Sequence, residues 1–131
     1  PDQPLIFAVP QDVLHMEMRN GERCMNGLVA ASFRFTGDKF AQNLQALVRT
    51  LGVPFSIFEK LIHKKMQVCI SPMTGRNWKK VHAGMGAALR ASSGVLDEGM
   101  KMKFAALFDG LNDILRFAEV CSSNEADDLS R

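Results

Sequence analysis

From residue 38 onward, apolar residues recur at intervals of three and four positions, which is the spacing that an amphipathic helix produces. The pattern predicts helices over residues 38–51, 54–65, 76–91 and 95–121. Asp38 is placed to cap the first of these helices, Gly52 to end it and Pro54 to begin the next. The sequence therefore predicts a mainly α-helical fold, a bundle of about four helices.

The first quarter of the chain has a different pattern. The segment LIFAV between Pro4 and Pro10 has the length and composition of a short buried strand. Further along, alternating apolar and polar residues lead into Asn20-Gly21, a preferred pair for a two-residue hairpin turn. We therefore predict a small N-terminal β-hairpin. The alternative is an all-α fold, and the sequence leaves strand and helix both open for residues 5–33.

The last predicted helix carries an apolar seam from Met100 to Cys121 that advances by alternating steps of four and three residues. The chain also has eight methionines, a residue that fills irregular cores and makes adaptable interface contacts. These features favour a homo-oligomer over a monomer. The residues expected to mediate self-association are Met16, Met18, Phe104, Phe108, Leu111 and Leu115.

A chain of 131 residues with 47% hydrophobic residues can build one core but is short for two domains. We expect a single globular domain over residues 1–121 and a flexible acidic tail over residues 122–131. The sequence contains neither an apolar run near the roughly 20 residues that span a bilayer nor a secretory signal pattern. We expect a soluble protein with no membrane partner, in the cytoplasm, with the nucleus as the alternative compartment.

The net charge of +2 conceals a basic middle section. Residues 49–103 contain ten Lys or Arg and three Asp or Glu, a net charge of +7, whereas residues 1–48 carry −1 and residues 104–131 carry −4. A locally basic surface attracts phosphate groups whatever the total charge of the protein is. The charge distribution therefore directs attention to the middle of the chain.

The predicted helix over residues 76–91 separates these charges from its apolar residues. At 100° per residue, its Lys and Arg residues fall on one arc around the small Ala83 and Ala87, and the opposite arc carries Trp78, Val81 and Met85. Trp78 is therefore expected in the core. Small residues within a basic arc would let a phosphate backbone approach closely. The expected nucleic-acid contacts are Lys60, Lys64, Lys65, Arg76, Lys79, Lys80 and Arg90.

The sequence thus favours a non-catalytic nucleic-acid-binding protein that recognises RNA or the nucleic-acid backbone rather than a DNA sequence. The alternative is a helical protein-interaction module, such as an adaptor, an effector or an assembly subunit, with an acidic protein as a further partner. The segment 44–65 loosely resembles a helix-turn-helix, with Gly52 in the turn. Phe55 and Phe58 depart from that pattern, because a recognition helix exposes polar residues to the bases.

Other chemistry has little support in the sequence. Cys24 or Cys69 could act as a nucleophile with a histidine as base, but no catalytic motif accompanies either residue. The three cysteines are scattered, and we expect them to be reduced. His, Cys and acidic residues lack zinc-site spacing, and Gly84 and Gly86 suit close helix packing better than dinucleotide binding. We expect no enzyme activity, cofactor or metal.

Overall fold

The computed structural model describes the backbone of residues 3–130 and the side chains of residues 15–120. This part of the chain is mainly helical and contains one small antiparallel sheet of two strands. Its elements in order are α1 Gln3–Thr36, the short 3-10 helix η1 Gly37–Lys39, α2 Phe40–Arg49, β1 Ile57–Ile62, β2 Lys65–Ile70, α3 Gly75–Ala91 and α4 Glu98–Ser130.

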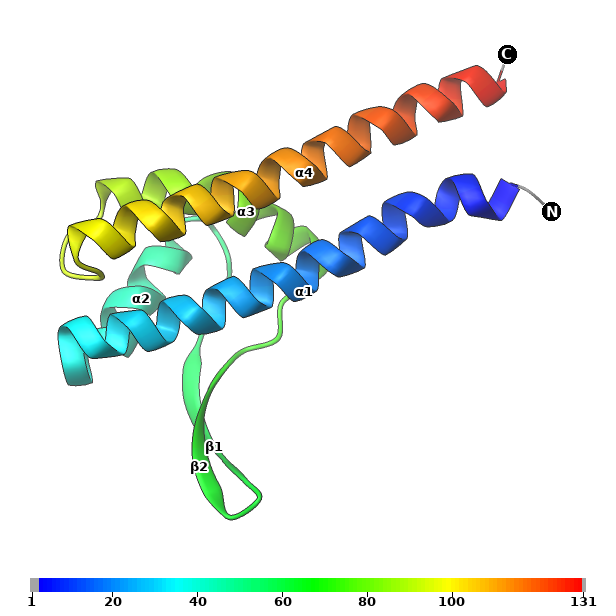
Figure 1. Cartoon of the computed structure of the whole chain (residues 1–131). Coiled ribbons are helices and arrows are strands. Elements are labelled where there is room, and N and C mark those ends of the chain that lie inside the picture. The colour runs from blue at the N-terminus through cyan, green and yellow to red at the C-terminus, as the bar shows by residue number, and fades with distance from the viewer. Residues whose placement is uncertain (1–2, 131) are drawn as a thin grey trace.

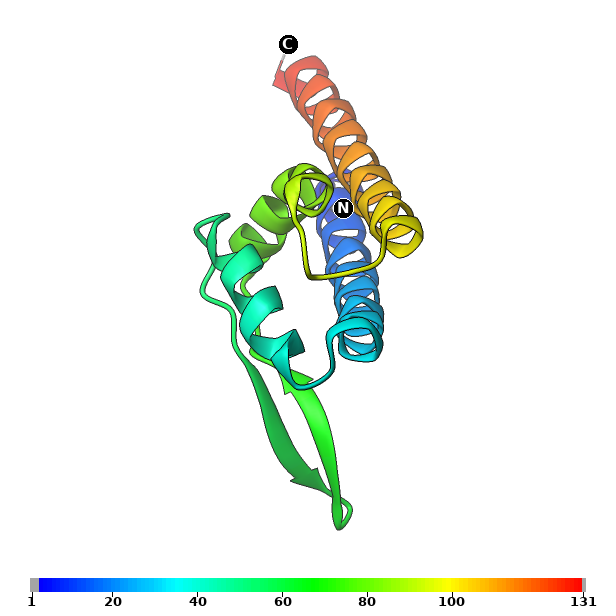
Figure 2. The ribbon, with the colours of Figure 1, turned by 90° about the vertical axis from the view of Figure 1, so that its left-hand side faces the viewer.

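The two longest helices, α1 and α4, run antiparallel, and their ends that carry the chain termini extend beyond the rest of the molecule (Figure 1). Helix α3 packs against α4, and α2 lies beside the C-terminal half of α1 (Figures 1 and 2). The hairpin of β1 and β2 projects from this helical body in both views. The molecule therefore consists of a helical body and a protruding arm.

The core lies where the four α-helices meet. Its fully buried side chains include Leu28 from α1, Leu44 from α2, Met85 from α3 and Phe108 from α4. Burying one such side chain stabilises a fold by about 1.5–3 kcal/mol relative to leaving it in water. Trp78 is also buried, as its place on the apolar arc of the 76–91 helix predicts.

Two glycines of α3 allow close packing, as the sequence predicts. A Cβ atom on Gly84 would lie 2.7 Å from Cδ2 of Leu51. A Cβ atom on Gly86 would overlap the carboxylate of Asp109 and lie 3.1 Å from the backbone oxygen of Ala105 on α4. The absence of a side chain at Gly86 therefore lets α3 and α4 approach each other closely.

The predicted N-terminal β-hairpin and the strand before it are wrong, because residues 5–33 belong to the continuous helix α1. The buried side of α1 repeats at helical spacing but contains the polar residues Glu17 and Ser32, which interrupt its apolar pattern. Gly21 does not form a turn. It lies inside the helix where α1 contacts Trp78 and His82.

Three of the four predicted helices are present, as α2, α3 and α4. The predicted helix over residues 54–65 is wrong, because this segment contains strand β1 and the start of the hairpin turn. The helical alternative is correct for residues 5–33, but strands β1 and β2 contradict an all-α fold for the chain and also the helix-turn-helix resemblance. Gly52 follows the end of α2 and has a φ of 76°, as expected of a glycine that terminates a helix. Asp38 is predicted to cap this helix, but α2 has no side-chain cap hydrogen bond.

The backbone of residues 122–130, for which the sequence predicts a flexible acidic tail, is helical and continues α4. At its other end, α4 is capped by Asp97, whose Oδ1 accepts a hydrogen bond of 2.9 Å from the backbone N–H of Met100. Helix α3 has a comparable cap, since Oγ1 of Thr74 accepts a hydrogen bond of 3.2 Å from the N–H of Asn77.

Candidate functional site

The hairpin is held at its base by side chains of α2. Oε1 of Gln45 accepts a hydrogen bond of 2.7 Å from the backbone N–H of Ile57, and Nε of Arg49 donates one of 3.1 Å to the carbonyl oxygen of Phe55. Ser56 and Ser71 bond to each other across the base of the hairpin. These contacts fix the direction in which the hairpin leaves the body.

The tip of the hairpin is a tight turn of two residues, His63 and Lys64. Their φ angles of 51° and 64° are both in the left-handed region, as a type I′ turn requires. This turn suits the twist of paired strands, but glycine and asparagine adopt it more readily than His or Lys. The turn sets the register in which Leu61 pairs with Met66 and Phe58 with Cys69.

Each face of the hairpin carries its own set of residues, because cross-strand partners share a face and successive residues alternate. One face, which we call the outer face, consists of Ile57, Glu59, Leu61, Met66, Val68 and Ile70. The inner face consists of Phe58, Lys60, Ile62, Lys65, Gln67 and Cys69. Leu61, Met66 and Val68 of the outer face are 65%, 60% and 48% exposed. Apolar side chains therefore lie in solvent along the projecting arm.

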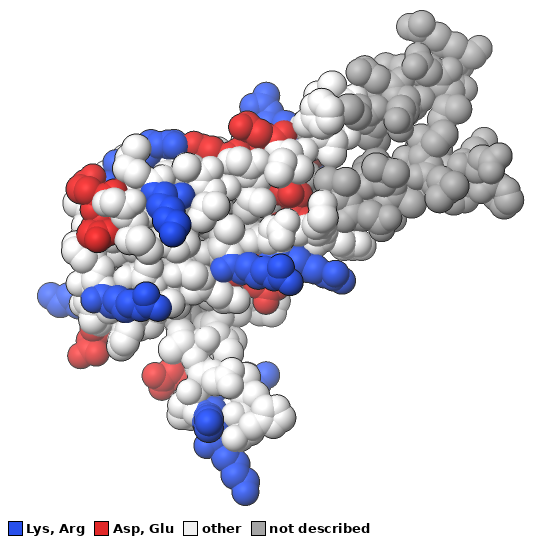
Figure 3. All heavy atoms as spheres, viewed as in Figure 1, with Lys and Arg blue, Asp and Glu red and all other residues white. Residues whose placement is uncertain are grey.

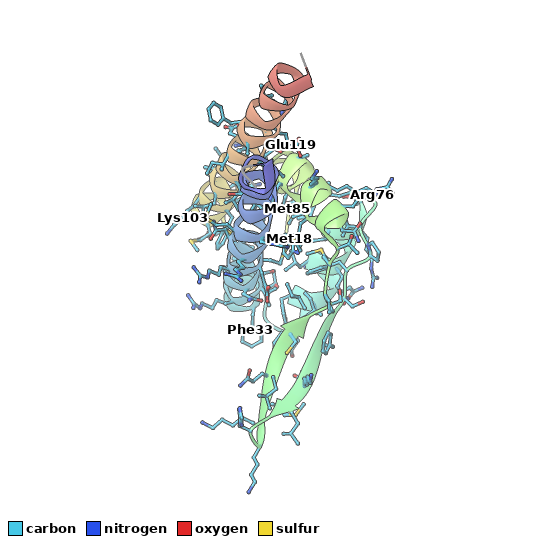
Figure 4. The ribbon with its side chains drawn as sticks, turned by 90° about the vertical axis from the view of Figure 1, so that its right-hand side faces the viewer. Met18, Phe33, Arg76, Met85, Lys103 and Glu119 are labelled. Carbon is cyan, nitrogen blue, oxygen red and sulfur yellow. The ribbon has the colours of Figure 1, made fainter. Side chains whose placement is uncertain are left out.

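A groove of about 650 Å³ separates the inner face of the hairpin from α1. We call it the hairpin groove. Its apolar lining comes from Phe58 and Ile62 on the hairpin, Ala30 and Phe33 on α1, and Phe40 at the start of α2. In Figure 4, Phe33 marks the end of α1 beside the base of the hairpin. Phe33 is half-exposed, and its ring meets that of Phe40 edge to face, with centroids 5.2 Å apart.

The residues predicted to contact nucleic acid lie on two separate elements. Lys60, Lys64 and Lys65 are exposed on the hairpin, and the other four predicted cations are exposed on α3. Figure 3 shows the Lys and Arg side chains of the hairpin apart from those of the helical body, with acidic side chains interspersed on the body. The cations therefore do not form one continuous stripe.

Two of the four α3 cations pair with carboxylates of α4. Nζ of Lys79 lies 2.9 Å from Oε1 of Glu119, and an Nη of Arg90 lies 2.6 Å from Oδ2 of Asp109. Arg76 and Lys80 have no carboxylate within 4 Å among the described side chains. In Figure 4, Arg76 lies at the start of α3, and Glu119 of α4 lies beside this helix, where it pairs with Lys79 in the first half of α3. The arc predicted on this helix is present, but its charge is partly neutralised.

The residues predicted to mediate self-association are divided between core and surface. Phe104, Phe108 and Leu115 are buried inside the chain, the two phenylalanines within the main core cluster, and the three present no surface to a second subunit. Met18 and Leu111 are half-buried. Only Met16 of the predicted set is well exposed, so the apolar surface of this protein lies largely elsewhere.

A buried polar cluster lies between α1 and α3. Glu17 and His82 are fully buried, with Oε2 of Glu17 3.9 Å from Nδ1 of His82, and neither side chain has a hydrogen-bond partner among the described atoms. Burial raises the pKa of Glu17 and lowers the pKa of His82. Burial, and then the Glu17 carboxylate, raise the pKa of Cys24. A raised thiol pKa disfavours the thiolate that a catalytic cysteine needs.

Other kinds of site find no support in the described side chains. Among residues 15–120, His, Cys, Asp and Glu do not gather into a group of three or more that could hold a metal ion. The described helices also include none with both the length and the apolar composition of a membrane span. Comparisons with protein families, with curated proteins and with solved structures gave no match for this chain.

The hairpin was missed from the sequence, although a signal for it is present. Residues 57–62 and 65–70 are two short runs that include Ile, Val and Phe, and two residues separate them, as in a tight hairpin. The pair His63-Lys64 lacks the asparagine or glycine that usually marks such a turn. Without that turn signal, the helical spacing of Phe55 and Phe58 favours a helix over residues 54–65 instead of the hairpin.

Proposed function

We propose that this protein is a non-catalytic protein-interaction module that works as an assembly subunit and self-associates through its hairpin. The observation that carries the proposal is the exposure of Leu61, Met66 and Val68 on a projecting two-stranded arm. A two-stranded hairpin is marginally stable alone in water and gains stability when one face packs on another surface. A protein partner would supply that surface.

The energetics favour such a contact. Removing an exposed leucine, methionine or valine side chain from water is worth about 1.5–3 kcal/mol when burial is complete. The three outer-face side chains lie on one side of the arm, so a single partner surface can cover them together. The hydrogen bonds that Gln45 accepts and Arg49 donates orient the arm before binding, which lowers the entropy cost of association.

A double substitution in the hairpin tests this function. Leu61→Ser with Met66→Ser removes the two most exposed apolar side chains of the outer face and preserves the turn and the strand pairing. We expect the wild type to sediment as an oligomer at concentrations where this variant sediments as a monomer. Met102→Ser is the matched control, because Met102 is similarly exposed but lies on α4. A monomeric wild type, or an unchanged oligomer in the hairpin variant, would refute the proposal.

Binding of a nucleic-acid backbone is the second candidate function. It is favoured by five of the seven predicted cations, which are exposed and have no carboxylate within 4 Å among the described side chains: Lys60, Lys64, Lys65, Arg76 and Lys80. Because the hairpin and α3 carry these cations separately, two strand segments or a bent strand would be needed to reach both groups. This requirement makes the second candidate weaker than the first.

Titration of a fluorescent single-stranded RNA at several salt concentrations tests the second candidate. Binding to phosphates releases counterions, so log affinity should fall with log salt by about 0.7 per phosphate contact on a single strand. Substitution of Lys60 and Lys64 by alanine should lower that slope. An affinity independent of salt, or no binding at low salt, would remove nucleic acid from consideration.

A further inference from the structure

The chain carries a protruding apolar surface and a hollow apolar one. The protruding surface is the tip of the hairpin, where the cross-strand partners Leu61 and Met66 are both well exposed. The hollow one is the hairpin groove, in which Ala30, Phe33 and Phe40 line the side opposite the hairpin. Its volume of about 650 Å³ lies within the range of pockets that bind organic groups.

The tip of the hairpin cannot fill the groove of its own chain. The inner face of the hairpin is itself one wall of that groove. The base of the arm is fixed by the bond from Ile57 to Gln45, and a turn of two residues leaves no length for the tip to fold back. The protruding and hollow surfaces can therefore be matched only between two copies of the chain.

We infer that two copies clasp each other, with the hairpin tip of each copy in the hairpin groove of the other. This inference rests on the proposed self-association and names the surface that receives the hairpin. In a two-fold arrangement of this kind, the inner faces of the two hairpins meet, and the outer face of each hairpin meets α1 of the second copy. Each contact then occurs twice, which doubles the apolar area buried.

The apolar residues on both sides of this contact are complementary. The outer face offers Leu61 and Met66, and α1 offers the exposed Ala30 and Phe33. Each of these side chains is exposed in the single chain and would be covered in the clasp. A methionine at the tip can adapt its shape to an irregular aromatic groove.

The outer face of the hairpin and one edge of the α1 surface carry opposite charges. Glu59 is the one carboxylate of the hairpin segment 57–70, and it lies on the outer face. At 100° per residue, the exposed Arg19, Arg23 and Arg34 line one edge of the α1 surface that includes Ala30. None of these three arginines pairs with a carboxylate within 4 Å among the described side chains. They are therefore available to Glu59 of the second copy.

Cross-linking tests the contact directly. In a chain whose three cysteines are replaced by alanine, Met66→Cys and Ala30→Cys are made in separate preparations, mixed and oxidised. We expect a covalent heterodimer that joins the two variants. Mixing Met66→Cys with Met102→Cys is the control and should give no such product, because α4 lies outside the clasp. A product that joins two copies of the Met66→Cys variant to each other, tip to tip, would overturn the inference.

A charge exchange provides an independent test. Ala30→Glu and Met66→Lys each place a charge at an exposed position, and each alone should raise the dissociation constant of the dimer at least about tenfold. The chain with both substitutions should recover dimerisation, because each new lysine meets the new glutamate of the other copy. Circular dichroism should show that all three variants keep the helical content of the wild type.

The two proposals fail in different ways. Suppose that the wild type sediments as a dimer, that Met66→Cys and Ala30→Cys form no cross-link, and that the variant with both Ala30→Glu and Met66→Lys stays monomeric. This result overturns the clasp and leaves hairpin-mediated association intact. A wild type that remains monomeric at every concentration overturns both. A cross-linked heterodimer together with recovery in the double variant supports both.

Discussion

Gly21 on α1 lies directly against His82 on α3, so that a Cβ atom at position 21 would be 2.6 Å from Nε2 of the imidazole. The same atom would be 2.9 Å from the ring of Trp78. Both rings are buried, and neither can move away without displacing its neighbours. The glycine therefore determines how closely the first and third helices approach each other.

Gly21→Ala should lower the free energy of unfolding by about 1–3 kcal/mol, because the added methyl group overpacks a buried contact. Gly27→Ala is the matched control in the same helix. A Cβ at position 27 would lie 3.5 Å from the ring of Phe104, an ordinary contact, so the better helix propensity of alanine should stabilise the fold by up to about 1 kcal/mol. Urea denaturation of the two variants measures the difference. Equal stability of both would contradict the packing described for Gly21.

His82 should make the protein less stable in mild acid. Burial lowers the pKa of His82 below its ordinary value of 6.5, so the unfolded chain binds a proton before the folded chain does. The free energy of unfolding should fall as the pH drops from 6.5 through the lowered pKa, by up to about 1.4 kcal/mol per pH unit. His82→Gln should remove this loss. The free energy of unfolding of the wild type and of His82→Gln, measured across that pH range, tests this prediction. The same pH dependence in both proteins would contradict it.

Glu17 should act in the opposite direction. Burial raises the pKa of Glu17 above its ordinary value of 4.5, so its contribution is full below that pH and is lost as the pH rises through the raised pKa. Glu17→Gln should therefore be more stable than the wild type at neutral pH, with a difference that shrinks in acid. The expected size is about 1.4 kcal/mol for each unit by which the pKa is displaced. A variant less stable than the wild type at neutral pH would show that ionised Glu17 is favoured in the fold.

The hairpin turn offers a substitution that strengthens the arm. Replacing His63 and Lys64 by Asn and Gly would place residues that favour positive φ at both turn positions, which now have φ of 51° and 64°. We expect the free energy of opening the hairpin to rise by about 1 kcal/mol, so that the amides of residues 57–70 exchange more slowly. Self-association should also become tighter. Faster exchange in the substituted hairpin would contradict the assigned turn.

The sequence predicts α3 well because its apolar residues keep a helical spacing, although His82 and Gly86 also lie on its buried side. Helix α3 has Val81, Met85 and Leu89 at a spacing of four, and its predicted and observed limits differ by one residue. Helix α1 was missed because its buried side includes Glu17, Gly21 and Ser32, two polar residues and a glycine. Glu17 and Gly21 are explained by their contacts with α3, which no local pattern contains.

The candidate site was less predictable than the fold. The separation of cations from apolar residues on α3 follows from helical periodicity alone, and the structure agrees with it. The ion pairs of Lys79 and Arg90 with α4 depend on how two distant segments pack. The exposure of Leu61 and Met66 depends on a hairpin whose turn residues are atypical, so the sequence alone pointed to helix α3 as the functional surface.

Hydrogen exchange measured at several protein concentrations tests hairpin-mediated association most directly. Self-association through the arm predicts that the amides of residues 57–70 exchange more slowly as the concentration rises, whereas exchange in α3, which does not line the hairpin groove, stays constant. The variant with Leu61→Ser and Met66→Ser should lose this dependence. Exchange in the hairpin that is the same at every concentration, in a protein that sediments as a monomer throughout, would contradict the account.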